Sequence, residues 1–181
     1  MKTFLVHLAV LLVIPSLAMA QNTEIQPYEI IKKIGEVELR FYPSATLVET
    51  SGGNNFGKLF QYISGNNTTK EKIAMTAPVY MDESKSQMAF VMPLEVHEKG
   101  APTPKGDNVS LRVTEPRYVA AVRYSGYTNS RKESTHKKML LETLQENNIS
   151  TIGTVEILGY DSPYKFYNRR NEVMVEIAYT K

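Results

Sequence analysis

Cysteine and tryptophan are both absent from this chain of 181 residues. Without cysteine, the protein can form no disulfide, no thiolate nucleophile and no cysteine-ligated metal site. Histidine is scarce as well, with only three residues, His7, His97 and His136, far apart in the sequence. Because no Ser-His-Asp or Cys-His set can be assembled from these residues, we predict that the protein is not an enzyme.

An excess of either charge is also missing. The chain has 21 basic and 19 acidic residues, a formal net charge of +2 at pH 7. Binding to nucleic acid or to an anionic membrane surface relies on a clear excess of Lys and Arg. We therefore expect no nucleic-acid partner. Residues 52–53 are a glycine pair, but the Lys and Ser or Thr of a phosphate-binding loop do not follow them.

Long apolar runs are missing except at the start of the chain. Residues 1–20 combine Lys2, an apolar stretch over residues 4–14 and the small residues Ala18 and Ala20 around a candidate cleavage site. This pattern is typical of a cleavable secretory signal peptide, and its apolar core is too short for a membrane anchor. We expect export to the periplasm or the exterior, and a single domain over residues 21–181 with no integral membrane segment.

The rest of the sequence is dominated by strand patterns. Residues 28–34 and 37–42 alternate apolar and polar side chains around Gly35, as a tight hairpin does. Further strands are predicted at residues 45–50, 73–81, 88–92, 118–124, 155–160 and 172–179.

Two helices are predicted between these strands. One starts at Asn54 or Asn55 and places Phe56, Leu59, Phe60 and Ile63 on one face, and the other covers residues 130–147. Residues 93–107 are rich in Pro and Gly and are predicted to be an extended surface loop.

The second half of the sequence repeats the order of the first. Three landmarks of the first half have counterparts in the second: Leu39-Arg40 and Leu111-Arg112, Pro43 and Pro116, Ser51-Gly52 and Ser125-Gly126. Each set is followed by a helix and two strands, which indicates a duplicated β-β-α-β-β unit. A cleft tends to form where two such halves meet.

Methionine is concentrated in residues 73–92. Strand alternation places Met75 on the same face as Ile73, Ala77, Val79 and Met81, and Met92 on the same face as Met88 and Phe90. A methionine-rich face suits a packed core or an adaptable binding surface. The spacing leaves both alternatives open.

The same stretch carries a family resemblance. IAMTAPV at residues 73–79 followed by FVMP at 90–93 resembles the signature hairpin of the SOUL/haem-binding protein family. Three further segments match in order: YEIIKKIGEVELRFYP at 28–43, YISGNN at 62–67 and YDSPYKFYNRRNEVMVEI at 160–177. The resemblance implies an α+β fold, a distorted antiparallel β-barrel of two pseudo-symmetric β-β-α-β-β units with two helices packed on the sheet. It also implies non-covalent binding of haem or a related tetrapyrrole, and we expect a monomer.

The resemblance also points to the mode of haem binding. Some family members carry a His where this sequence has Phe41, so we predict a haem site without a His axial ligand. His97, in the predicted loop, and His136, on the charged side of the second helix, are expected to be solvated surface residues.

Five residues make up the predicted site. In relatives without that His, the first helix lines the pocket at positions that match Phe56 and Phe60, and a basic residue that meets a propionate matches Lys165. Met75 and Met92 are candidate lining residues because of the strand faces they occupy. Core packing of the apolar residues and a solvated loop position for Lys165 are the alternatives.

Two rival functions remain open. The cleft could instead bind other flat apolar small molecules, similar to the effector-binding domains of drug-responsive regulators. A protein–protein interaction module would need a large exposed apolar patch.

Overall fold

The computed structural model describes residues 23–106 and 108–179, so the predicted signal peptide lies outside the described residues. The strands are β1 (Glu24–Ile25), β2 (Glu29–Ile34), β3 (Val37–Tyr42), β4 (Ala45–Ser51), β5 (Thr76–Ala77), β6 (Val79–Asp82), β7 (Gln87–Val91), β8 (Ser110–Thr114), β9 (Arg117–Tyr124), β10 (Thr151–Gly159) and β11 (Asn171–Ile177). The helices are α1 (Asn55–Ile63), α2 (Leu94–Lys99) and α3 (Ser130–Glu146). In this part of the chain no helix is long and apolar enough to cross a bilayer.

Nine strands form one antiparallel sheet in the order β2-β3-β9-β11-β10-β6-β7-β4-β8. The short strands β1 and β5 pair separately in parallel. The α+β class with a large antiparallel sheet is confirmed, but the predicted barrel is wrong, because β2 and β8 end the sheet without pairing to each other. Lys32 and Lys33 on β2 are exposed, and charged side chains on an edge strand discourage further pairing.

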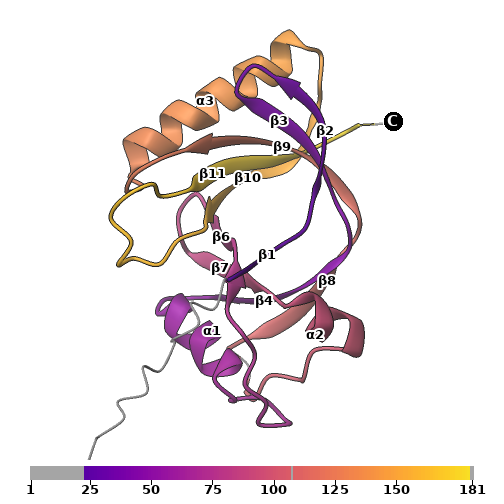
Figure 1. The fold of residues 1–181 in the computed structure, drawn as a ribbon, viewed down its shortest axis with the longest axis vertical. Helices are drawn as coiled ribbons and strands as arrows, with labels where there is room; N and C mark the ends of the chain where they lie inside the picture. The colour runs from indigo at the N-terminus through magenta and orange to yellow at the C-terminus, as the bar shows by residue number, and fades with distance from the viewer. Residues whose placement is uncertain (1–22, 107, 180–181) are drawn as a thin grey trace, which may run out of the picture.

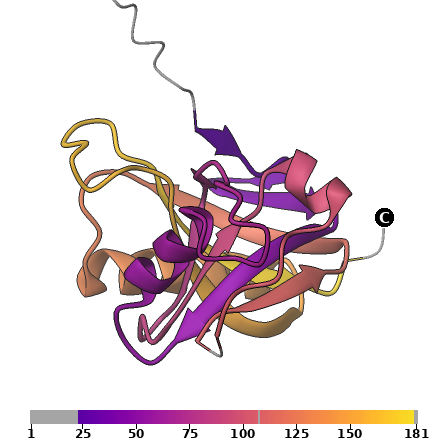
Figure 2. The same cartoon turned by 90° about the horizontal axis from the view of Figure 1, so that it is seen from below.

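The helices cover opposite halves of the sheet (Figure 1). Leu140 and Leu144 of α3 pack on β3, β9, β10 and β11, while Leu59 and Ile63 of α1 pack in a cluster with β4 and β7. The two predicted helices are therefore present and packed on the sheet. A third, central cluster, with Tyr80 among its members, joins residues of both halves of the sheet. Figure 1 shows α1 and α2 together at the end of the molecule away from α3, and Figure 2 shows the molecule from that end.

Strand β9 shows how this layering follows from sequence. Ala120 and Val122 belong to the cluster under α3, whereas Val119 and Ala121 belong to the central cluster. Successive side chains point to opposite faces of a strand. A strand covered on both faces is therefore apolar at nearly every position.

Two segments differ from the prediction. The surface loop expected over residues 93–107 contains α2, whose exposed Glu95 and Lys99 form an ion pair one turn apart. The strand expected over residues 73–81 is divided into β5 and β6 at Pro78, which has no N–H to donate to a neighbouring strand. The duplication of the two halves stays a prediction.

Candidate functional site

The outer face of α1 carries an exposed aromatic pair. The helix buries Leu59, Tyr62 and Ile63, while Phe56 and Phe60 are 48% and 51% exposed. Their rings stack with centroids 6.0 Å apart and planes inclined by 13°. Phe56 also meets the buried ring of Phe90 edge-on at 5.3 Å. The pair is thus anchored to the core at one end and presents flat apolar surface to solvent.

The two candidate methionines occupy the core side of the same helix. Met92 is 3% exposed and Met75 is half-buried, and both pack in the cluster that contains Leu59. Met92 is therefore packed in the core, which was one of the two alternatives for the methionine-rich face. Met92 also lines an apolar cavity of about 300 Å3 between α2 and the segment around Pro43. Phe56 and Phe60 do not line this cavity.

Lys165 lies in the loop between β10 and β11. Its Nζ donates to Oδ1 of Asp161 at 2.6 Å, and its side chain is 37% exposed. Burial acts to raise the pKa of Asp161, but the ammonium of Lys165 and the N–H of Arg170 outweigh it and lower that pKa. Arg169 closes the loop by donating to the carbonyl oxygens of Ser162 and Lys165 at 2.7 and 2.6 Å.

This ordered loop exposes aromatic side chains. Tyr164, Phe166 and Tyr167 are all mostly exposed. In Figures 1 and 2 the loop between β10 and β11 lies on the same side of the molecule as α1. That the five predicted site residues form one binding site stays a prediction.

Both histidines are partly buried at the surface, and each makes a contact with the protein. Nδ1 of His97 lies 2.9 Å from Oγ1 of Thr46, and Nδ1 of His136 lies 2.7 Å from the carbonyl oxygen of Lys132. The ring of His136 stacks on that of Tyr124 at 4.6 Å. Each helix places its histidine against a strand neighbour, which sequence spacing could not reveal. Within the described ranges, no group of three or more His, Asp or Glu could hold a metal ion.

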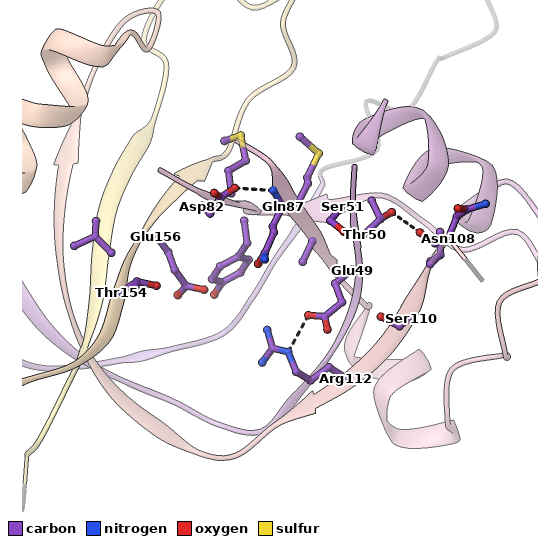
Figure 3. A pocket seen from close by; sticks show the side chains of 16 residues that line it. Glu49, Thr50, Ser51, Asp82, Gln87, Asn108, Ser110, Arg112, Thr154 and Glu156 are labelled. Carbon is purple, nitrogen blue, oxygen red and sulfur yellow. Dashed lines mark hydrogen bonds and ion pairs between the residues drawn. The ribbon is translucent and has the colours of Figure 1, made fainter. Parts of the chain in front are cut away.

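A second cavity of about 320 Å3, here named the polar groove, opens on the inner face of the sheet (Figure 3). Strand register explains its composition, because Glu49 pairs with Ala89 and Ser110, and Glu156 pairs with Asp82. Five strands thereby direct side chains into the same space: β4, β6, β7, β8 and β10.

Charges in the polar groove are only partly compensated. Glu49 pairs with Nε of Arg112 at 2.8 Å, and Glu156 pairs with Arg117 at 3.3 Å. Burial raises the pKa of Glu156, although Arg117 and Arg112 act to lower it. Asp82 is engaged in its own turn, where Oδ1 accepts from the N–H of Gln87 at 2.6 Å.

A family model described as SOUL heme-binding protein matches residues 23–176. The chain belongs to the SOUL family. Heme-binding protein 2 of Homo sapiens is 29% identical over 158 residues, covering 77% of each chain. Heme-binding protein 2 of Mus musculus is 26% identical over 187 residues, covering 88% of this chain and 91% of the relative.

Among solved structures, the C-terminal domain of EcmrR superposes with a TM-score of 0.53 at 12% identity, covering 84% of this chain and 99% of that one. An uncharacterized conserved protein from Listeria innocua gives a TM-score of 0.54 at 11% identity, covering 79% and 92%. At such low identity these likenesses concern the fold alone. The family resemblance drawn from IAMTAPV and RRNEV is confirmed.

The closing motif of this SOUL chain is structural. Arg170 donates to Glu172 and to the hydroxyl of Tyr28, while Arg169 fixes the preceding loop. Sequence reasoning missed the polar groove, although one signal was present. Glu49 and Glu156 are each the single charged residue of a strand, β4 and β10, and a charge within a strand of this kind needs a partner or a function.

Proposed function

We propose that this SOUL family protein binds haem or a related tetrapyrrole non-covalently on the exposed face of α1, without a histidine axial ligand. The comparisons support the ligand class, since the similar curated proteins are named heme-binding proteins. The observation that carries the location is the parallel, half-exposed pair of Phe56 and Phe60. A flat tetrapyrrole makes the largest contact area with flat apolar side chains that are already exposed at the surface.

The residues present fit the chemical needs of haem. A tetrapyrrole needs apolar contacts for its ring and cations for its propionates. Phe56 and Phe60 can provide the first by dispersion contacts, and Lys165 can provide the second by exchanging Asp161 for a propionate. This arrangement favours a ring lying against α1 over one enclosed in a cavity. When bound, haem would supply an iron centre with open coordination chemistry.

We infer further that the protein is exported and acts as a binding protein without catalysis. Residues 1–20 support export by their signal-peptide pattern. Production of the full chain in a bacterial host, followed by N-terminal sequencing of the periplasmic protein, should give a mature start near Gln21. Retention of the intact chain in the cytoplasm would overturn this inference.

Hemin titration tests the central proposal. The mature chain should shift the Soret band saturably at one hemin per protein. The double variant Phe56→Ala/Phe60→Ala should bind at least tenfold more weakly while melting at nearly the same temperature. A titration no different from that of an unrelated soluble β-protein would overturn the proposal.

A second candidate function follows from the apolar cavity beside α2. Its volume of about 300 Å3 and its lining by Pro27, Pro43, Val91 and Met92 suit a small apolar molecule other than haem. A thermal-shift screen separates the candidates, because ligands of the native state raise the melting temperature. Replacement of Ala45, at the cavity wall, by Phe should abolish such shifts and leave hemin binding intact.

A further inference from the structure

The polar groove lies apart from the residues proposed for haem. It does not include Phe56, Phe60 or Lys165 among its lining residues. An inference about the groove therefore stands independently of the haem proposal.

The groove continues the interior of the sheet. Along the same inner face, Leu47, Leu158 and Met174 belong to the central hydrophobic cluster. Strand pairing sets Glu156 of β10 directly opposite Met174 of β11, so the groove begins where this cluster ends. Larger apolar side chains at these positions would simply extend the core. Polar side chains line the open cavity at this end of the interior instead.

Two carboxylates face each other across the opening. Figure 3 shows Glu156 on one side of the groove and Glu49 on the other. Oε2 of Glu156 binds Arg117, and Oε2 of Glu49 binds Arg112. Neither Oε1 atom accepts a hydrogen bond from the residues that the structure describes. Each carboxylate thus has one oxygen available to a ligand.

The balance of charge favours a cation. The lining residues include three carboxylates, Glu49, Asp82 and Glu156, and one guanidinium, Arg112. Arg117 adds a second positive charge beside Glu156 but also pairs with Glu176 at 3.5 Å, which restores the negative excess. A phosphate or carboxylate ligand would meet this excess charge unfavourably.

We propose that the polar groove binds a small organic cation, a protonated amine or guanidinium, between the carboxylates of Glu49 and Glu156. The cavity volume of about 320 Å3 lies at the lower end of small-molecule pockets. The two ammonium groups of a diamine can each donate a hydrogen bond to one free Oε1 atom, one on each side of the groove. A bound cation also offsets the burial that disfavours the charged form of Glu156.

Calorimetric titration with agmatine, putrescine and spermidine tests this proposal, with 1,4-butanediol as a neutral probe of similar length. At least one amine should bind saturably, the diol should not, and affinity should fall as salt concentration rises. Glu156→Gln and Glu49→Gln should each weaken amine binding at least tenfold. Glu142→Gln, which removes an exposed carboxylate on α3, should leave it unchanged.

Three outcomes would overturn the proposal: no saturable amine binding, equal binding of the diol, or unchanged affinity in both groove variants. Thermal melting establishes that each variant is folded, and if Glu156→Gln fails to fold, the more exposed Glu49→Gln decides alone. Hemin titration of Glu49→Gln should match that of the unmodified chain. Loss of amine binding with normal hemin binding thus separates this inference from the proposed haem site.

Discussion

Arg40 on β3 and Glu172 on β11 form a bidentate ion pair in the interior, with Nη1–Oε2 and Nη2–Oε1 distances of 2.6 and 3.0 Å. Their side chains are 2% and 0% exposed. Strand β9 lies between the two strands that carry them, so the pair joins positions that the backbone ladder does not connect directly. Tyr160 and Arg170 donate to the same carboxylate, which leaves the buried charge well compensated.

Removal of the carboxylate should destabilise the fold strongly. In Glu172→Ala, the guanidinium of Arg40 would remain buried without its main partner, at an expected loss of about 3–5 kcal/mol in the free energy of unfolding. Urea unfolding measures this loss. The matched control Glu142→Ala breaks an exposed pair with Lys138 and should change the unfolding free energy by less than about 0.5 kcal/mol. A loss below about 1 kcal/mol in Glu172→Ala would contradict the argument.

Acid should lower the free energy of unfolding by protonating the same carboxylate. Burial acts to raise the pKa of Glu172, but the hydrogen bonds and charges of Arg40 and Arg170 lower it below the ordinary value of 4.5. The unfolded chain then takes up a proton more readily than the native protein. The resulting stability is present above about pH 4.5 and is lost as the pH falls through the native pKa. Urea midpoints between about pH 3 and 7 should therefore drop on the acid side, and Glu172→Gln should flatten that drop.

The sequence predicted the local elements of the fold well. The β2–β3 hairpin around Gly35 and the helix at Asn55–Ile63 depend on turn chemistry and on periodicity within a few residues. The open edges at β2 and β8 depend on which distant strands meet, and no local pattern encodes that. Helix α2 was missed because Pro102 and Pro104 suggested an extended loop over the whole passage.

The sequence predicted the candidate site less completely. Periodicity placed Phe56 and Phe60 on the same face as Leu59, but in the structure they lie at the margin of the buried stripe and are about half exposed. The facing carboxylates Glu49 and Glu156 come from β4 and β10, which are separated by β6 and β7 in the sheet. Their proximity to one cavity depends on register over four strands, which a single sequence does not specify.

Aromatic truncation on α1 should separate binding from stability. Phe56→Ala and Phe60→Ala remove half-exposed rings, so each should cost less than about 1.5 kcal/mol of unfolding free energy while weakening hemin binding. Leu59→Ala, one residue before Phe60 but fully buried, should cost about 2–5 kcal/mol. Hemin affinity of the folded Leu59→Ala protein should change less than that of Phe60→Ala. A larger loss of hemin affinity in Leu59→Ala than in Phe60→Ala would show that the tetrapyrrole binds elsewhere.

The histidines should be dispensable for haem binding. His97 and His136 each use Nδ1 in a contact with the protein and lie outside the aromatic face of α1. His97→Ala and His136→Ala should therefore leave the Soret maximum and the hemin affinity unchanged. A shift of the Soret band in either variant, with an unchanged melting temperature, would identify that histidine as an iron ligand.

Lys165 should contribute to haem affinity through a propionate. Its ammonium is half-exposed and paired with Asp161, so a propionate must compete with that carboxylate and the net gain should be about 1 kcal/mol, roughly a fivefold change in affinity. Lys165→Met should weaken hemin binding by this amount, whereas Lys138→Met on the outer face of α3 should not. Hemin dimethyl ester lacks the propionate charges and should bind the unmodified chain and Lys165→Met equally. Equal loss for hemin and its ester would show that Lys165 acts by packing or by loop order, because only a charge interaction distinguishes the two ligands.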